Sequence, residues 1–150
     1  MNKREKILIS IISVILIILT ITSISLYNLK NRASFLQEQI DYIFIYSLRI
    51  AISAYSGVDE NGFASENDEE DFYKNAYLCS NLHDLTSYSN NKVFTDIVAL
   101  LSNTFPLHGI PKLSNELTEC ILRYISHPYE YAELESEITE GIQEIFDTYW

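Results

Sequence analysis

Two pairs of metal-binding residue types stand four positions apart in this 150-residue chain: Cys79 with His83, and Glu116 with Cys120. Thiolate, imidazole and carboxylate groups are ligands of zinc, and positions four apart share one face of a helix. If the two helices packed side by side, all four groups would converge. Such spacings also arise by chance, and neither pair has the tight turn of a zinc knuckle. We therefore keep as an alternative hypothesis an envelope enzyme or metal-binding protein that uses these four residues.

The same two cysteines also form a candidate disulfide. Outside the cytoplasm an even number of cysteines commonly pairs, and closing a loop of about forty residues stabilises a fold by roughly 4 kcal/mol. Both cysteines fall on the apolar side of a predicted helix, where a free thiol behaves as a small apolar side chain. The sequence leaves a Cys79–Cys120 disulfide and two buried thiols as equal alternatives.

Carboxylates gather in a loop and along the last helix. The loop follows part of the calcium-loop pattern through Asp59, Asn61 and Gly62, but its first position is Gly57, which offers no side-chain ligand. Along the last predicted helix, the carboxylates form a row of Glu130, Glu133, Glu137, Glu140 and Glu144. This helix lacks the Glu-x-x-His motif of di-iron bundles, so we expect the row to be the solvated edge of a surface helix. The sequence also has no Gly-x-Ser-x-Gly or phosphate-loop motif, and we expect no catalytic, cofactor-binding or metal-binding residues.

Helical periodicity dominates the elements that carry these residues. Apolar residues recur every three or four positions, strand-like alternation is not sustained, and breakers separate the segments. The first segment has no Gly or Pro until Gly57. Its apolar stripe, which we expect to face the core, includes Leu36, Ile43 and Ala51. We expect an all-α fold, with one membrane helix leading into a bundle of about five helices. The predicted helices cover about 7–56, 72–85, 92–105, 112–126 and 130–148.

The stretch from Ile7 to Tyr27 contains twenty-one residues without a charge, Gly or Pro. A helix of that length covers roughly 30 Å, the thickness of a bilayer core, and this one is apolar on every side. We therefore expect a transmembrane helix over 7–27, a cytoplasmic stub over 1–6 and a helical domain over 28–150. A cleaved signal peptide is the alternative, with Ser23-Ile24-Ser25 as a poor cleavage site.

Orientation is predicted from the flanking basic residues. Lys3, Arg4 and Lys6 precede the apolar run, whereas only Lys30 and Arg32 follow it closely. This weak positive-inside bias favours a single-pass signal anchor in a bacterial plasma membrane, with the N-terminus cytoplasmic and the C-terminal domain extracytoplasmic. The same domain facing the cytoplasm remains an alternative hypothesis.

The domain beyond the apolar run is strongly acidic. It carries seven Lys and Arg against twenty Asp and Glu, a net charge of −13, which argues against nucleic acid as a partner. The other compositional feature is tyrosine: ten of the chain's eleven tyrosines lie beyond the apolar run, and tyrosine is favoured at protein interfaces. We expect a non-catalytic module that binds an unknown protein partner or ligand, of accessory, immunity or inhibitor type. Its predicted interface residues are Tyr42, Tyr46, Tyr73 and Tyr77.

Overall fold

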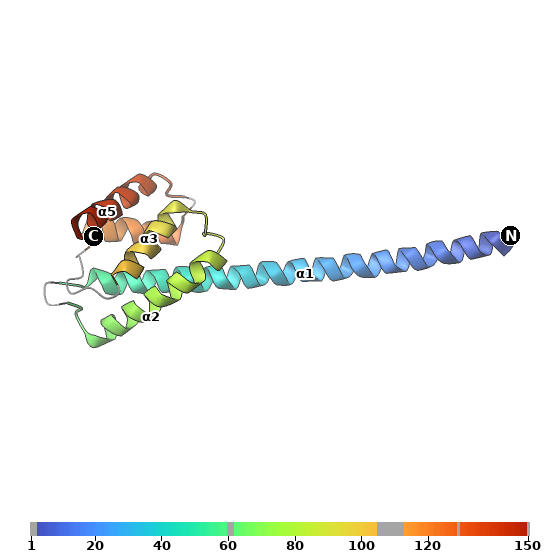
Figure 1. Cartoon of the computed structure of the whole chain (residues 1–150), viewed down its shortest axis with the longest axis horizontal. Helices are drawn as coiled ribbons and strands as arrows, with labels where there is room; N and C mark the ends of the chain where they lie inside the picture. The colour runs from blue at the N-terminus through green and yellow to red at the C-terminus, as the bar shows by residue number, and fades with distance from the viewer. Residues whose placement is uncertain (1–2, 60–61, 105–112, 129, 150) are drawn as a thin grey trace. The chain divides into compact units, whose positions relative to one another are not determined.

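The chain is all-α, and the computed structural model describes residues 3–59, 62–104, 113–128 and 130–149, with side chains from residue 11 (Figure 1). Apart from one isolated bridge between Asp59 and Gly62, these ranges contain no β-structure. The residues form two compact units, Met1–Glu38 and Gln39–Trp150. The five α-helices are α1 (Lys3–Ser56), α2 (Glu66–Leu82), α3 (Lys92–Asn103), α4 (Asn115–Ser126) and α5 (Leu134–Tyr149), and a short 3-10 helix, η1 (His83–Leu85), follows α2.

The N-terminal unit is the first part of α1, and its side chains are exposed from Ile11 to Leu36. By length and composition, α1 is long and apolar enough to cross a membrane, with a mean hydropathy of 2.1 in its most apolar window and none of that window buried. Its threonines bond within the helix: Thr20 Oγ1 donates to the Leu16 carbonyl at 2.8 Å, and Thr22 Oγ1 donates to the Ile18 carbonyl. These bonds satisfy hydroxyl donors that would otherwise be unpaired in lipid.

In the second unit, the remaining part of α1 supplies one side of the core. The buried stripe follows the three- and four-residue steps of a helix, and it includes Ala51 as predicted. Leu36 and Ile43 are 60% and 42% exposed, so their predicted core positions were wrong. This segment is apolar on more than one side, and the sequence pattern alone did not select every buried position. The stripe comprises Phe44, Ser47, Leu48, Ala51, Ile52 and Tyr55.

Helix α2 begins at Glu66, six residues before the predicted start at residue 72. The Ser65 hydroxyl caps it by accepting from the Asp68 backbone N–H at 3.1 Å, and Glu66, Asp68 and Glu69 occupy the first turn. Carboxylates at this end interact favourably with the helix dipole. The predicted continuation of this helix to residue 85 was wrong: α2 ends at Leu82, η1 redirects the chain, and Leu85 is 58% exposed. His83 is buried instead.

The last three helices complete the bundle, in which α3 contacts both α2 and α5, and α4 packs on α5. The apolar residues along one side of α3 are buried, among them Phe94, Ile97 and Leu101. Helix α4 begins at Asn115, after the predicted start, because the Ser114 hydroxyl caps it by accepting from the Leu117 N–H at 3.1 Å. Gly141 allows α5 to approach α4 closely, since a Cβ there would lie 2.9 Å from Leu117 Cδ1.

Two aromatic groups lie along the buried stripe of α1. Around Phe44, the rings of Phe94 and Tyr88 lie 5.8 and 6.2 Å away, and Tyr124 lies 5.6 Å from Phe94. Further along α1, the Tyr55 ring lies 5.3 Å from Phe72. Tilted and edge-on arrangements of this kind are favourable for aromatic pairs. Several of the eleven tyrosines therefore belong to the core.

Candidate functional site

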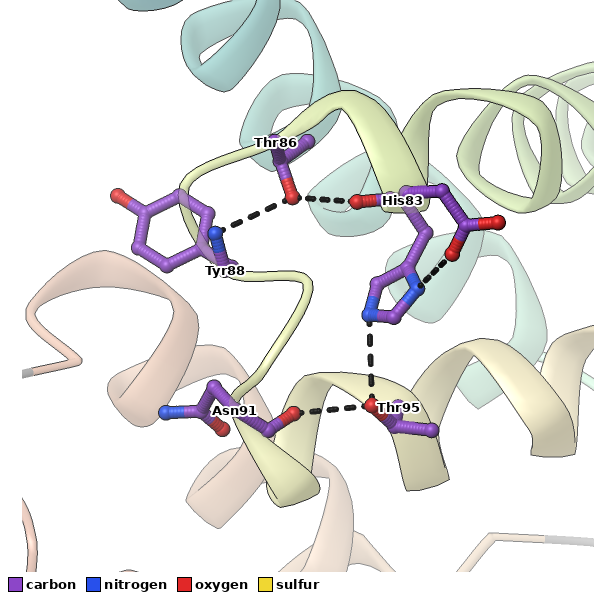
Figure 2. Close-up of polar contacts among 6 residues, drawn as sticks. His83, Thr86, Tyr88, Asn91 and Thr95 are labelled. Atoms are coloured by element: carbon purple, nitrogen blue, oxygen red, sulfur yellow. Dashed lines mark hydrogen bonds and ion pairs between the residues drawn. The ribbon is translucent and has the colours of Figure 1, made fainter.

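His83 lies in a polar turn that joins α2 to α3 (Figure 2). Its Nε2 is 3.4 Å from Thr95 Oγ1, and its Nδ1 is 3.4 Å from Asp84 Oδ1. Thr95 donates its hydroxyl proton to the Asn91 carbonyl at 3.1 Å, which leaves Oγ1 to accept from His83. The turn closes with Thr86 Oγ1 donating to the His83 carbonyl at 2.7 Å. Nε2 therefore links the turn to α3, whereas Nδ1 lies beside the exposed Asp84 carboxylate and pairs with it only when the ring is protonated.

Cys79 is fully buried and its sulfur faces α1. Sγ lies 3.9 Å from the Phe44 carbonyl oxygen, which accepts a weak hydrogen bond from the thiol. Burial raises the pKa of this thiol to about 12, so the metal-binding thiolate is disfavoured. Cys79 therefore acts as a small core residue in this structure.

Cys120 and Glu116 face a different part of the bundle. Cys120 is half-buried, and its thiol interacts with Glu137 of α5; burial first, and then the hydrogen bond to Glu137, raise its pKa. Glu116 is exposed and lines a groove of about 450 Å³ with Glu137 and Glu144. Within the described ranges, no three His, Cys, Asp or Glu side chains come together as a metal site. The four residues of the alternative metal-site hypothesis are thus not brought together.

The two cysteines are free thiols in this structure. One sulfur contacts the α1 backbone and the other contacts a carboxylate of α5. Formation of a Cys79–Cys120 disulfide in an oxidising compartment stays a prediction.

The predicted acidic features lie at the surface. All five carboxylate residues of the row on and before α5 are exposed. In the predicted calcium loop, Asp59 and Gly62 exchange backbone hydrogen bonds of 2.9 and 3.1 Å, and Gly62 has a φ of 107° that favours glycine. Asn61 lies outside the described residues.

The four predicted interface tyrosines have different environments. Tyr42 and Tyr46, one turn apart on α1, stack with ring centroids 6.2 Å apart and an interplanar angle of 13°, and they are 66% and 55% exposed. Tyr77 on α2 is also 66% exposed. Tyr73 is half-buried, with its ring 5.4 Å from Phe72. Three of the four are thus available at the surface, and Tyr73 supports the core.

Sequence reasoning missed an open groove of about 570 Å³ along α4. Arg123 and His127 line it, together with Leu122 of α4 and Tyr131 of the following turn. The Arg123 guanidinium carbon lies 5.0 Å from the centroid of the Tyr131 ring. The only sequence signal was an Arg and a His four residues apart in an acidic domain. Ser56 at the end of α1 also lines the groove.

A comparison with protein-family models, curated proteins and solved structures finds no match to this chain.

Proposed function

We propose that the protein is a membrane-anchored, extracytoplasmic and non-catalytic helical module that binds a partner protein. The observation that carries the proposal is the exposed stack of Tyr42 and Tyr46. With Ile43, which is 42% exposed, these residues form an apolar surface that we call the tyrosine face. The core packs against a different side of α1, so the tyrosine face has no structural role within the described part of the chain.

The chemistry of the tyrosine face suits a protein interface. Two stacked rings are already ordered, so binding loses little side-chain entropy, and each ring offers a large apolar area with a hydroxyl at its edge. Buried aromatic anchors supply much of the binding energy in protein complexes. The net charge of −13 in residues 28–150 favours a partner with a basic surface and disfavours anionic lipid as the occupant.

The apolar part of α1 supports the anchoring part of the proposal. We place the bilayer over residues 7–27, with residues 1–6 on the cytoplasmic side and the bundle outside. Anchoring raises the local concentration of the module toward any partner held at the same membrane. An accessory, immunity or inhibitor role is consistent with such an arrangement.

Site-specific photocrosslinking in intact cells tests the interface. A photoreactive phenylalanine analogue at Tyr42 or Tyr46 should give one discrete adduct in the membrane fraction. The matched control is the same analogue at Gln143, which is exposed on α5. Tyr42→Ala combined with Tyr46→Ala should abolish co-purification of that partner. Adducts of equal yield at Gln143, or none at either tyrosine, would overturn the proposal.

Topology requires its own test. Glu133 is exposed, so Glu133→Cys in a Cys79→Ala, Cys120→Ala background presents a single accessible thiol. A membrane-impermeant maleimide should label it in intact cells. Protection until lysis would instead place the bundle in the cytoplasm and exclude an extracytoplasmic partner.

A further inference from the structure

We propose that the α4 groove is a binding site for a carboxylate carried on an apolar body, independent of the tyrosine face. The first observation is that two arginines of an acidic domain meet at this groove. Arg123 and His127 line the groove, and Arg49 reaches its rim, where Nη2 donates to Ser126 Oγ at 3.0 Å. Arg49 and Arg123 are two of only seven basic residues after the apolar run.

The second observation concerns the partners of the two guanidinium groups. Within the described ranges, neither Arg49 nor Arg123 forms an ion pair with a carboxylate, despite twenty acidic residues after the apolar run. Glu119 stands four residues before Arg123 on α4, a spacing that commonly forms a pair. Arg123 instead lies over the Tyr131 ring at 5.0 Å. Stacking orders the guanidinium while its N–H donors remain available to a planar carboxylate.

The rest of the groove selects the ligand class. Leu122 and Tyr131 offer apolar surface beside the cationic groups, and about 570 Å³ is in the range of small-molecule sites. Ser126 Oγ already donates to the Leu122 carbonyl at 2.8 Å and accepts from Arg49, so it orients Arg49. The acidic field of the domain, with Glu119 on the groove itself, disfavours a dianion. A singly charged acid with an aromatic or aliphatic body meets these conditions.

The probe is N-acetylphenylalanine, with N-acetylphenylalaninamide as the uncharged match. Each is titrated into the full-length, isotope-labelled protein in lipid nanodiscs, and amide chemical shifts are followed by NMR. The acid should shift the amides of residues 122–127, and the amide compound should not. Equal shifts with both compounds, or no shifts with the acid at millimolar concentration, would overturn the proposal.

Matched variants assign the binding to the two arginines. Arg123→Gln and Arg49→Gln should each weaken binding of the acid, Arg123→Gln by about tenfold or more. Lys92→Gln makes the same charge change at an exposed position on α3 and should leave binding unchanged. Glu119→Gln removes the opposing carboxylate and should tighten binding, which a merely destabilised fold would not do. Indistinguishable affinities of Arg123→Gln and Lys92→Gln would contradict the assignment.

A second comparison, with peptide ligands, identifies whether the carboxylate belongs to a protein or to a small molecule. A short peptide ending in a free Phe carboxylate is compared with its amidated form and with N-acetylphenylalanine. Tighter binding of the free-ended peptide than of the small acid would assign the groove to a protein C-terminus. The reverse order would assign it to a small organic acid. Loss of the tyrosine face through Tyr42→Ala should change neither affinity, which separates this site from the proposed partner interface.

Discussion

The Asp41 carboxylate of α1 accepts two hydrogen bonds from Ser87, which lies forty-six residues further along the chain. The Ser87 backbone N–H donates at 2.9 Å and its hydroxyl donates at 2.7 Å. Ser87 belongs to the turn that follows η1, so this pair attaches the α2–α3 connection to α1. Hydrogen bonds to a charged acceptor are stronger than neutral ones.

Removing this attachment should destabilise the bundle. We expect Asp41→Ala to cost about 1–3 kcal/mol, because it leaves the Ser87 N–H without its charged acceptor. The measurement is urea unfolding of the full chain in mild detergent, followed by near-ultraviolet circular dichroism. Glu133→Ala, at an exposed carboxylate, is the control and should be near neutral. A double-mutant cycle with Ser87→Ala should give a coupling energy; additive effects would contradict a direct interaction.

Tyr55→Phe should stabilise the protein. The Tyr55 side chain is fully buried, and its Oη has no hydrogen-bond partner in the described part of the chain. The Thr104 hydroxyl lies close enough to lower the Tyr55 pKa somewhat, yet it donates its hydrogen bond to the Leu100 carbonyl at 2.5 Å. Replacing an unsatisfied hydroxyl by hydrogen should gain about 1 kcal/mol. Equal or lower stability than wild type in the urea assay would show that Oη is satisfied.

The same residue makes stability depend on alkaline pH. Burial raises the pKa of Tyr55 from 10.0 to about 12, and the nearby Tyr149 adds to the rise. The folded state thus disfavours the phenolate. The resulting contribution to folding stability is fully present below pH 10 and is lost as the pH rises through about 12. Its size is about 2–3 kcal/mol. Tyr55→Phe should flatten this decline, although Cys79 contributes in the same direction, and Tyr42→Phe should leave it unchanged.

The two thiols should differ in their rates of alkylation. Cys79 is buried with a pKa of about 12, whereas Cys120 is half-buried with a pKa raised by burial and by Glu137. In reduced protein, maleimide should therefore modify Cys120 slowly and Cys79 only after unfolding. Single-cysteine variants followed by mass spectrometry measure both rates. Faster modification of Cys79 would contradict this packing. If neither thiol of protein isolated without reductant reacts after unfolding, the two are bonded.

Asn91 performs two roles that substitutions can separate. Its Oδ1 caps α3 by accepting from the Phe94 N–H at 3.2 Å, and its Nδ2 donates to Tyr124 Oη at 2.9 Å. Tyr124 in turn donates to Glu135 at 2.8 Å. Asn91→Ser retains a capping oxygen and loses the donor, so it should cost about 1 kcal/mol less than Asn91→Ala. Equal thermal midpoints for the two variants would show that the cap contributes nothing.

Helix content and the end of α1 before Gly57 were predictable from the sequence, because apolar periodicity and helix breakers act locally. Helices α2 and α4 begin after the capping residues Ser65 and Ser114, and not at the predicted residues 72 and 112. The buried positions of α1 were predictable only in part: Ala51 is buried as predicted, whereas Leu36 and Ile43 are exposed. Which positions are buried depends on the helices that pack on α1 later in the chain. The second helix was predicted to reach residue 85 because the apolar period continues, but it ends at Leu82.

The candidate functional residues were likewise predictable only where the local sequence decides their environment. The exposure of Tyr42 and Tyr46 was predictable because both lie off the apolar stripe. Their stacking and the contrasting role of Tyr73 required the packed structure. The α4 groove was not predictable, because Arg49 and Ser126 lie seventy-seven positions apart. A single sequence carries no signal for contacts of that separation.

The buried stripe of α1 also limits how the bundle can be released from a membrane by proteolysis. A cut near Gln39, where the second compact unit begins, would leave Phe44 to Tyr55 with the other helices and yield a folded soluble fragment. A cut near Gly57 would remove one side of the core, and the fragment from residue 57 onward would expose apolar surface and aggregate. Release of an intact, folded bundle is therefore confined to cleavage before Phe44.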